Sequence, residues 1–241
     1  MIYSSENSWL FVKTTKVGGA SVELALSRIA GKASIITPLL PQEEKVRLSL
    51  DYPGPSGYEL PLDEYTNFQR LLRRIKGRVP AAPYRNHSSA CEIQQRLGAK
   101  KFSSLFKFSI VRNPFDYIVS KYHWKLVKAK GLPMPNFRDW LTDNPEALLE
   151  NRRITHISGK NTMDYMIKFE NMVQDFRDIA DKLRLDDKFF QDLSEIKLKG
   201  DSRQSFPKPS DRFAEFPELL DLVFLLCKNE CEIYGYTGPS R

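Results

Sequence analysis

The stretch Phe11-Val-Lys-Thr-Thr-Lys-Val-Gly-Gly-Ala-Ser-Val-Glu23 decides how this chain folds. The apolar run from Trp9 to Val12 predicts a short buried strand, and the amphipathic run from Val22 to Ile29 predicts a helix that ends at Gly31. A loop with two lysines and two glycines joins them. This arrangement points backbone N–H groups and the positive end of a helix dipole at an anion. The stretch therefore predicts a phosphate or sulfate cradle, to which Lys16 adds an ammonium group.

The order of residues in this loop excludes the phosphate loop of nucleoside triphosphatases. That motif places its lysine after the glycines, as Gly-x4-Gly-Lys-Ser/Thr. Here Lys16 comes before Gly18 and Gly19. The sequence also offers no obvious acidic residue at a strand end as a magnesium ligand. We therefore expect the loop to bind an anion without a metal.

Further along the chain, strands alternate with helices, which predicts an α/β fold in three layers with a central parallel sheet covered on both faces. The other expected strands are 33–40, 106–112 and 165–169. The other expected helices are 63–76, 113–130, 171–183 and 218–234, with short ones at 137–141 and 145–153. Residues 41–62 read as a loop with at most a short helix around Glu43 to Leu50, and residues 194–212 read as a flexible loop. No repeat or linker divides the chain, so we expect a single domain over 1–241.

The strongest strand pattern, Phe106 to Arg112, leads to a second candidate anion site. Asn113 suits the N-cap of the following helix, and Ser120 lies two turns further on the same face. Arginine supplies a rigid fork of donors for a phosphate group. Parallel strands open at the same edge of a sheet, where ligands of such folds bind. Arg112 and Lys16 should therefore face two anionic groups of one ligand.

One histidine is expected near the same edge. Tyr84-Arg-Asn-His87 reads as a short extended piece, and Ser89 and Glu92 are spaced as a capping box that opens the next helix. His87 therefore lies at a predicted strand-to-helix junction. An imidazole there is a candidate general base, because its ordinary pKa is near 6.5.

The composition narrows the class of protein. The net charge is +7, which suggests an anionic ligand or partner. The basic side of the predicted 63–76 helix is open to two interpretations, a solvated face or a surface for an anionic acceptor. Three scattered cysteines do not form a disulfide framework, and no stretch approaches the roughly 20 apolar residues of a membrane span. We therefore expect a cytoplasmic protein without a signal sequence.

These segments together resemble the sulfotransferases that use 3′-phosphoadenosine-5′-phosphosulfate (PAPS), in particular the carbohydrate-type branch with bacterial members. The loop from Lys16 to Ser21 resembles the family's 5′-phosphosulfate loop. Val111-Arg-Asn-Pro-Phe-Asp-Tyr-Ile-Val-Ser-Lys-Tyr122 resembles its 3′-phosphate motif. Further similar segments are Asn86 to Ile93, Ile167 to Glu170 and Ile233 to Tyr236. The resemblance implies a fold like that of the P-loop nucleotide kinases.

The resemblance also implies which residues contact the donor, and no metal is required. They are Lys16, Val17, Gly18, Gly19, Ala20, Ser21, Arg112 and Ser120, with Lys199 and Arg203 on a basic loop that closes over the nucleotide in relatives. Two positions depart from the family pattern. Thr15 stands where a proline is usual, and Ala20 replaces a hydroxyl residue, which leaves Ser21 as the main side-chain donor of the loop.

The expected reaction is transfer of a sulfuryl group to an acceptor hydroxyl. Lys16 would neutralise the leaving phosphate and His87 would accept the hydroxyl proton, with Glu23 as the alternative base. A carbohydrate is the expected acceptor, while a lipid-linked sugar or a small alcohol stays open. Two rival functions are a phosphoryl-transferring kinase and a non-enzymatic module that binds nucleic acid. The missing magnesium ligands disfavour the kinase, and the absence of a known binding motif disfavours nucleic acid as a partner. Oligomeric state cannot be read from the sequence.

Overall fold

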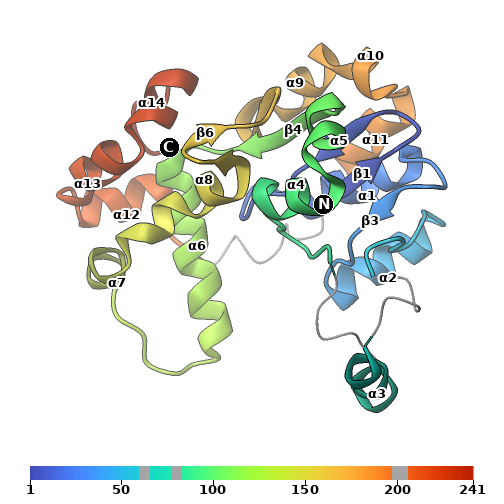
Figure 1. Cartoon of the computed structure of the whole chain (residues 1–241). Helices are drawn as coiled ribbons and strands as arrows, with labels where there is room; N and C mark the ends of the chain where they lie inside the picture. Colours follow the sequence, from blue (N-terminus) through green and yellow to red (C-terminus); the bar gives the residue numbers. More distant parts are fainter. Residues whose placement is uncertain (60–65, 77–82, 197–205, 241) are drawn as a thin grey trace.

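The computed structural model describes residues 1–59, 66–76, 83–196 and 206–240, and its centre is a five-stranded sheet (Figure 1). The strand order is β3-β1-β2-β4-β7. The strands of this sheet are β1 (Ile2–Ser4), β2 (Trp9–Phe11), β3 (Ile35–Ile36), β4 (Phe106–Val111) and β7 (Tyr165–Lys168). A separate two-stranded hairpin consists of β5 (His156–Ile157) and β6 (Lys160–Asn161).

The three strands that carry the predicted site run parallel. β4 pairs with β2 on one side, in the register Phe11 to Phe108, and with β7 on the other. β1, which the sequence did not predict as a strand, is antiparallel to both β2 and β3. The expected α/β fold with a central, mostly parallel sheet is confirmed. Because β2 and β4 are parallel neighbours, the loops that follow them leave the sheet at the same edge.

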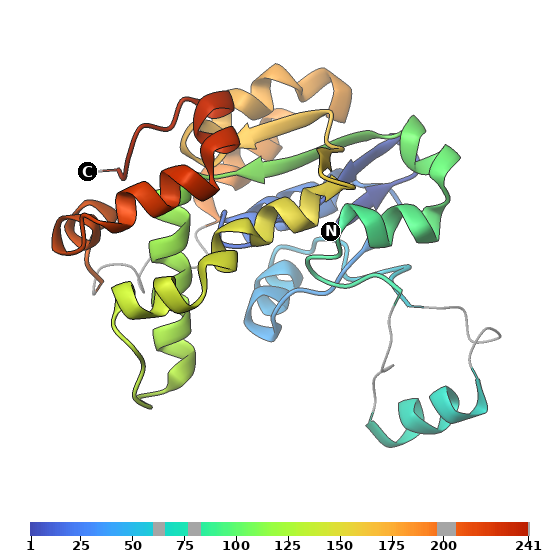
Figure 2. The same ribbon diagram turned by 60° about the vertical axis from the view of Figure 1, so that its left-hand side comes forward.

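Helices cover both faces of the sheet (Figure 2). On one face, Phe11, Phe108 and Ile167 pack against the helices that follow β2 and β7. These helices are α1 (Gly19–Ile29), α9 (Met172–Asp178), α10 (Ala180–Leu183) and α11 (Asp187–Glu195). On the other face, Leu10 and Val12 pack against α4 (Ala90–Leu97), α5 (Ala99–Ser104) and α8 (Glu150–Thr155). The sheet is therefore the middle of three layers.

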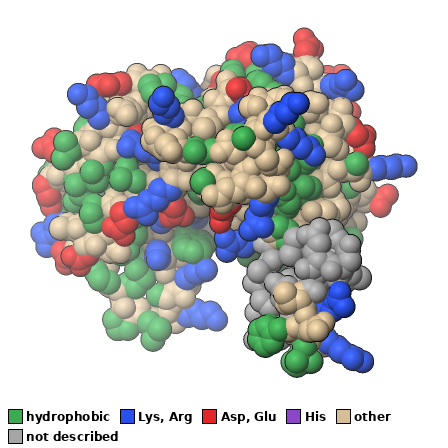
Figure 3. Space-filling view, viewed as in Figure 1, with side chains coloured by type: hydrophobic (Ala, Val, Ile, Leu, Met, Phe, Trp, Pro, Cys, Tyr) green, Lys and Arg blue, Asp and Glu red, His purple; other side chains and the backbone are tan. Residues whose placement is uncertain are grey.

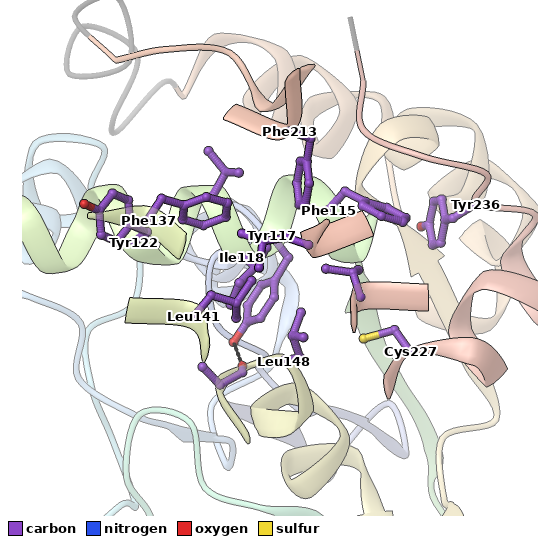
Figure 4. Close-up of a cluster of buried hydrophobic side chains, with 14 of the residues drawn as sticks. Phe115, Tyr117, Ile118, Tyr122, Phe137, Leu141, Leu148, Phe213, Cys227 and Tyr236 are labelled. Atoms are coloured by element: carbon purple, nitrogen blue, oxygen red, sulfur yellow. Dashed lines mark hydrogen bonds between the residues drawn. The ribbon is translucent and has the colours of Figure 1, made fainter. Parts of the chain in front are cut away.

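Beyond the carboxyl end of β4, a second apolar cluster forms around α6 (Pro114–Ala129). Phe213 lies between two other rings, 5.4 Å from Phe115 and 5.7 Å from Phe137 between ring centroids (Figure 4). The remaining helices here are α7 (Phe137–Asp143), η2 (Pro145–Leu149), α12 (Pro209–Glu215), α13 (Leu219–Leu226) and α14 (Lys228–Tyr234). This cluster fixes α6 and with it the position of the residues at its start.

Local sequence signals set the starts of two helices near the site. Asn113 accepts a hydrogen bond from the Phe115 N–H and caps α6, with Pro114 at the first helical position. Ser89 and Glu92 form the predicted capping box of α4. Both predictions are confirmed. Each cap depends only on residues within one helical turn, so the sequence alone could indicate it.

Other boundaries differ from the predictions. The expected strand 33–40 is reduced to Ile35–Ile36, and Tyr84 to His87 is a turn rather than a strand, with His87 at φ 64°. The expected terminal helix 218–234 is broken at Cys227. That break lets α13 pack Val223 into the cluster around α6 while α14 pairs Glu230 with Arg152.

Two helices lie between β3 and α4, namely α2 (Pro41–Ser49) and α3 (Asn67–Lys76). α2 agrees with the short helix expected around Glu43 to Leu50. α3 stands away from the body of the molecule (Figures 1 and 2). Among the described residues, each helix is too short or too polar to cross a bilayer.

Candidate functional site

The loop between β2 and α1 forms a tight reversal in front of the first turn of α1. Lys16 and Gly18 both adopt left-handed backbone conformations, at φ 60° and φ 69°. The Ser21 N–H closes the turn on the Gly18 carbonyl at 3.1 Å. A side chain at Gly18 would place its Cβ 3.2 Å from the Phe169 ring, so glycine is required there by both conformation and space. The loop therefore places the N-terminus of α1, a helix of 11 residues, at the edge of the sheet.

A buried ion pair lies beneath this loop. Lys13 Nζ donates to Glu23 Oε2 at 2.6 Å, and the other Glu23 oxygen contacts the Met1 amine. Burial acts to raise the pKa of Glu23, but the Lys13 ammonium and the Met1 amine outweigh it and lower this pKa to about 2. A fully buried carboxylate with both oxygens paired is a poor proton acceptor. The geometry therefore does not suit Glu23 as the alternative base, and its contacts instead tie α1 to the end of β2.

Asn151 on α8 holds the loop from the other side. Its Oδ1 accepts from the Thr15 N–H at 2.8 Å and from the Thr15 hydroxyl at 3.0 Å, and its Nδ2 donates to the Thr15 carbonyl at 3.1 Å. The Thr15 hydroxyl also lies 3.2 Å from the Tyr117 hydroxyl. We call the three hydrogen bonds between Thr15 and Asn151 the Thr15–Asn151 clamp. A proline at position 15 would have no N–H to donate. Thr15, which departs from the family pattern, therefore makes a bond to Asn151 that the usual proline could not make.

Arg112, at the end of β4, contacts the loop directly. Its guanidinium donates to the Lys16 carbonyl at 3.0 Å and stacks over the Phe169 ring, 4.6 Å from the centroid. The two predicted anion sites are therefore neighbours in the structure. Ser120 is half-buried two turns into α6.

The Lys16 ammonium lies beside an exposed aromatic ring. Its Nζ is 5.9 Å from the centroid of the Trp124 ring, which is 39% exposed. The neighbouring His123 stacks on Phe206 with 4.5 Å between ring centroids. Burial lowers the pKa of His123 to about 4, and the positive charges of Arg212 and Lys16 add to the effect. The sequence did not predict that Trp124 lies beside Lys16 or that Phe206 stacks on His123, because neither aromatic residue belongs to a motif.

His87 is linked to the same loop through a backbone atom. Its Nδ1 lies 3.0 Å from the Lys13 carbonyl oxygen. Because a carbonyl only accepts hydrogen bonds, Nδ1 carries the proton and Nε2 keeps its lone pair. Burial lowers the pKa of His87 to about 4, with a further contribution from the Lys13 ammonium. The imidazole is therefore neutral at pH 7 and is held in the tautomer that can accept a proton at Nε2.

The other predicted loop residues differ in what they can offer a ligand. Val17 is fully buried in the core and Ala20 is 8% exposed, so each can contribute only backbone groups. Gly19 packs so closely on Lys13 that a Cβ would lie 3.0 Å from that side chain. Ser21 is half-buried in the first turn of α1. The predicted donor contacts Lys199 and Arg203 lie outside the described residues.

A cavity of about 270 Å³ lies next to these groups, on the face of the sheet that α8 and α14 cover. Thr14, Arg112, Tyr117 and Asn151 are among the residues that line it. Arg112 and Asn151, which both hydrogen-bond to the loop, therefore also border this cavity.

Comparison with known proteins identifies the family of this chain. Residues 1–237 match the sulfotransferase family. Among solved structures, a sulfotransferase from Alicyclobacillus acidocaldarius is similar over 91% of this chain and 94% of its own, with 18% sequence identity and a TM-score of 0.39. No curated protein sequence matches significantly. Since the family match covers nearly the whole chain, including both basic loops at the sheet edge, this protein belongs to the sulfotransferase family.

Proposed function

We propose that this protein transfers a sulfuryl group from PAPS to a carbohydrate hydroxyl. The observation that carries the proposal is the contact between the two basic segments, in which Arg112 donates to the Lys16 carbonyl at 3.0 Å. A donor with a 5′-phosphosulfate and a 3′-phosphate needs two adjoining anion sites of this kind. The reducing cytoplasm is the expected location, and the free thiols of Cys91, Cys227 and Cys231 are compatible with it.

The residues present fit such a donor. The N-terminus of α1 and the Lys16 ammonium would receive the 5′ end, and Arg112 with Ser120 would receive the 3′-phosphate. The left-handed backbone at Gly18 turns the chain into the first turn of α1, whose N–H groups would face the anion. Phe169 lies against the Arg112 guanidinium at this junction, with 4.6 Å between Cζ and the ring centroid.

The chemistry of the step follows from charge. An acceptor oxygen forms a bond to sulfur as the bond between sulfur and the 5′-phosphate oxygen breaks, and the electron pair of that bond stays on the phosphate. Lys16 neutralises the charge that develops there, a type of stabilisation worth roughly 3 kcal/mol per well-placed donor. His87 accepts the proton of the acceptor hydroxyl at Nε2. Its low pKa keeps it unprotonated before the step.

A nucleotide-binding experiment tests the proposal. We expect 3′-phosphoadenosine-5′-phosphate (PAP) to raise the unfolding temperature and ATP with Mg²⁺ to have no effect, since a ligand at 100 times its Kd adds about 2.7 kcal/mol. Lys16→Ala and Arg112→Ala should abolish most of the shift. Lys100→Ala and Arg138→Ala, at exposed positions elsewhere, serve as matched controls. Sulfuryl transfer is then measured with ³⁵S-labelled PAPS and a panel of carbohydrate acceptors.

The same experiment separates the rival functions. Stabilisation by ATP with Mg²⁺ but not by PAP would indicate a kinase-like enzyme. Salt-sensitive binding to generic DNA that PAP does not change would indicate a nucleic-acid-binding module. Binding of PAP with transfer only to non-carbohydrate hydroxyls would retain the reaction and reject the acceptor class.

A further inference from the structure

Helix α3 exposes an apolar face and carries only positive charge. Phe68, Leu71 and Ile75 recur at helical spacing on one side, and they are 68%, 53% and 69% exposed. Arg70 and Arg74 are exposed on the opposite side. No acidic residue occurs between 66 and 76. Large exposed apolar side chains gathered on one helix face are uncommon in a protein without a partner for them.

The end of α6 repeats this combination. Val127 is 58% exposed and Leu132 is 73% exposed. Lys125, Lys128 and Lys130 are exposed around them, and no acidic residue occurs between 123 and 134. Trp124, a residue type enriched at membrane interfaces, lies one turn back with the Lys128 ammonium 4.2 Å from its ring centroid. The two segments, α3 and residues 124–132, are here called the two tips.

Both tips project from the same side of the molecule. They extend downward in two views related by rotation about the vertical axis (Figures 1 and 2). In the space-filling view, hydrophobic atoms occupy the ends of both projections and Lys or Arg atoms lie beside them (Figure 3). We propose that this side of the protein docks on the surface of a membrane that contains anionic lipids, with the apolar residues of the two tips in the headgroup region.

The chemistry of the tips favours a membrane over other partners. Amphipathic helices that bind at the interface combine Phe and Leu on one side with Lys and Arg on the other. A second copy of this chain would bring seven basic and no acidic residues of the tips toward the same set, so like charges would oppose its association. An acidic polysaccharide would use the basic side chains but would leave Phe68, Ile75 and Leu132 in water. Of these three, the anionic bilayer satisfies both the charge and the apolar ends.

Sedimentation of the full chain with lipid vesicles tests the proposal independently of sulfuryl transfer. We expect binding to vesicles of phosphatidylcholine mixed with phosphatidylglycerol, and little binding to phosphatidylcholine alone. Arg70→Gln/Arg74→Gln should weaken binding about 30-fold, from roughly fivefold per positive charge near the surface. Phe68→Ser/Ile75→Ser should weaken it by more than about tenfold, since two large apolar side chains then stay out of the membrane.

Matched variants away from the tips control for general loss of charge or apolar surface. Leu225→Ser, at a side chain that is 75% exposed on α13, and Lys100→Gln/Lys101→Gln on α5 should bind like the wild type. All variants replace exposed side chains, and unchanged circular dichroism confirms their folding. Equal binding by the tip variants and the wild type would overturn the proposal. So would a dimer in sedimentation velocity that Phe68→Ser/Ile75→Ser dissociates while vesicle binding is absent, or binding to an acidic polysaccharide but not to vesicles.

Discussion

Replacing Asn151 by alanine should weaken binding of the nucleotide, although Asn151 does not contact the nucleotide in the proposed site. The Thr15–Asn151 clamp consists of three hydrogen bonds between 2.8 and 3.1 Å, and all three are lost in Asn151→Ala. A hydrogen bond contributes about 0.5–1.5 kcal/mol net. Thr15 is half-buried, so water can replace part of the loss. We therefore expect the free energy of unfolding to fall by about 2 kcal/mol.

That loss should appear in two measurements. The unfolding temperature should fall by roughly 4–8 °C, since 1 kcal/mol corresponds to about 2–4 °C for a chain of this size. If the loop must be ordered to hold the 5′ end of the nucleotide, the Kd for PAP should also rise about 30-fold. Isothermal titration calorimetry measures that Kd directly. In turnover, the KM for the donor should rise more than kcat falls, because Asn151 positions the loop and does not contact the reacting atoms in this proposal.

Three variants make the result specific. Asn151→Asp keeps an acceptor for the Thr15 N–H but sets a carboxylate oxygen against the Thr15 carbonyl and adds a negative charge beside the proposed anion site, so its effect on PAP binding should be at least as large as that of Asn151→Ala. Thr15→Ala loses the hydroxyl and keeps both backbone bonds, so its effect should be intermediate. Asn144→Ala removes a half-buried asparagine whose Nδ2 donates to Trp140 at 2.9 Å, which should reduce stability without changing PAP binding. If Asn151→Ala weakens PAP binding no more than Asn144→Ala, the positioning role is refuted.

Two further predictions concern the same loop. Because the folded-state pKa of His87 is lowered to about 4 from 6.5, protons bind the unfolded chain preferentially, so wild-type stability should fall as pH drops from 6.5 to 4. In urea titrations at several pH values, His87→Gln should remove up to roughly 3 kcal/mol of this change in stability with pH. The same pH dependence of stability in the two proteins would contradict the lowered pKa of His87. Gly18→Ala forces a left-handed alanine at φ 69° against the Phe169 ring and should cost about 1–2 kcal/mol in thermal unfolding. Gly54→Ala, with no atom within 4 Å of the added Cβ, should be close to neutral, and equal effects of the two substitutions would contradict the steric argument.

The parts of the site that depend on neighbouring residues were predictable. The strand before the loop, the glycines that allow its reversal and the Asn113 cap that follows Arg112 each depend on residues within one or two turns along the sequence. Local propensity and capping act over that range. The alternation of strands and helices then predicted a parallel sheet, and a parallel sheet places the ends of β2 and β4 at one edge.

The sequence alone did not determine which groups meet across that edge. Asn151 is 136 residues from Thr15, and no spacing or motif marks it as the partner of the loop. Glu23 could be read as a base from its place on the predicted helix, but the packing of α1 buries it against Lys13. The tautomer of His87 depends on a carbonyl 74 residues away. Such pairings arise from the packing of separate elements, which local sequence does not specify, and it is this packing that brings the two predicted loops into contact.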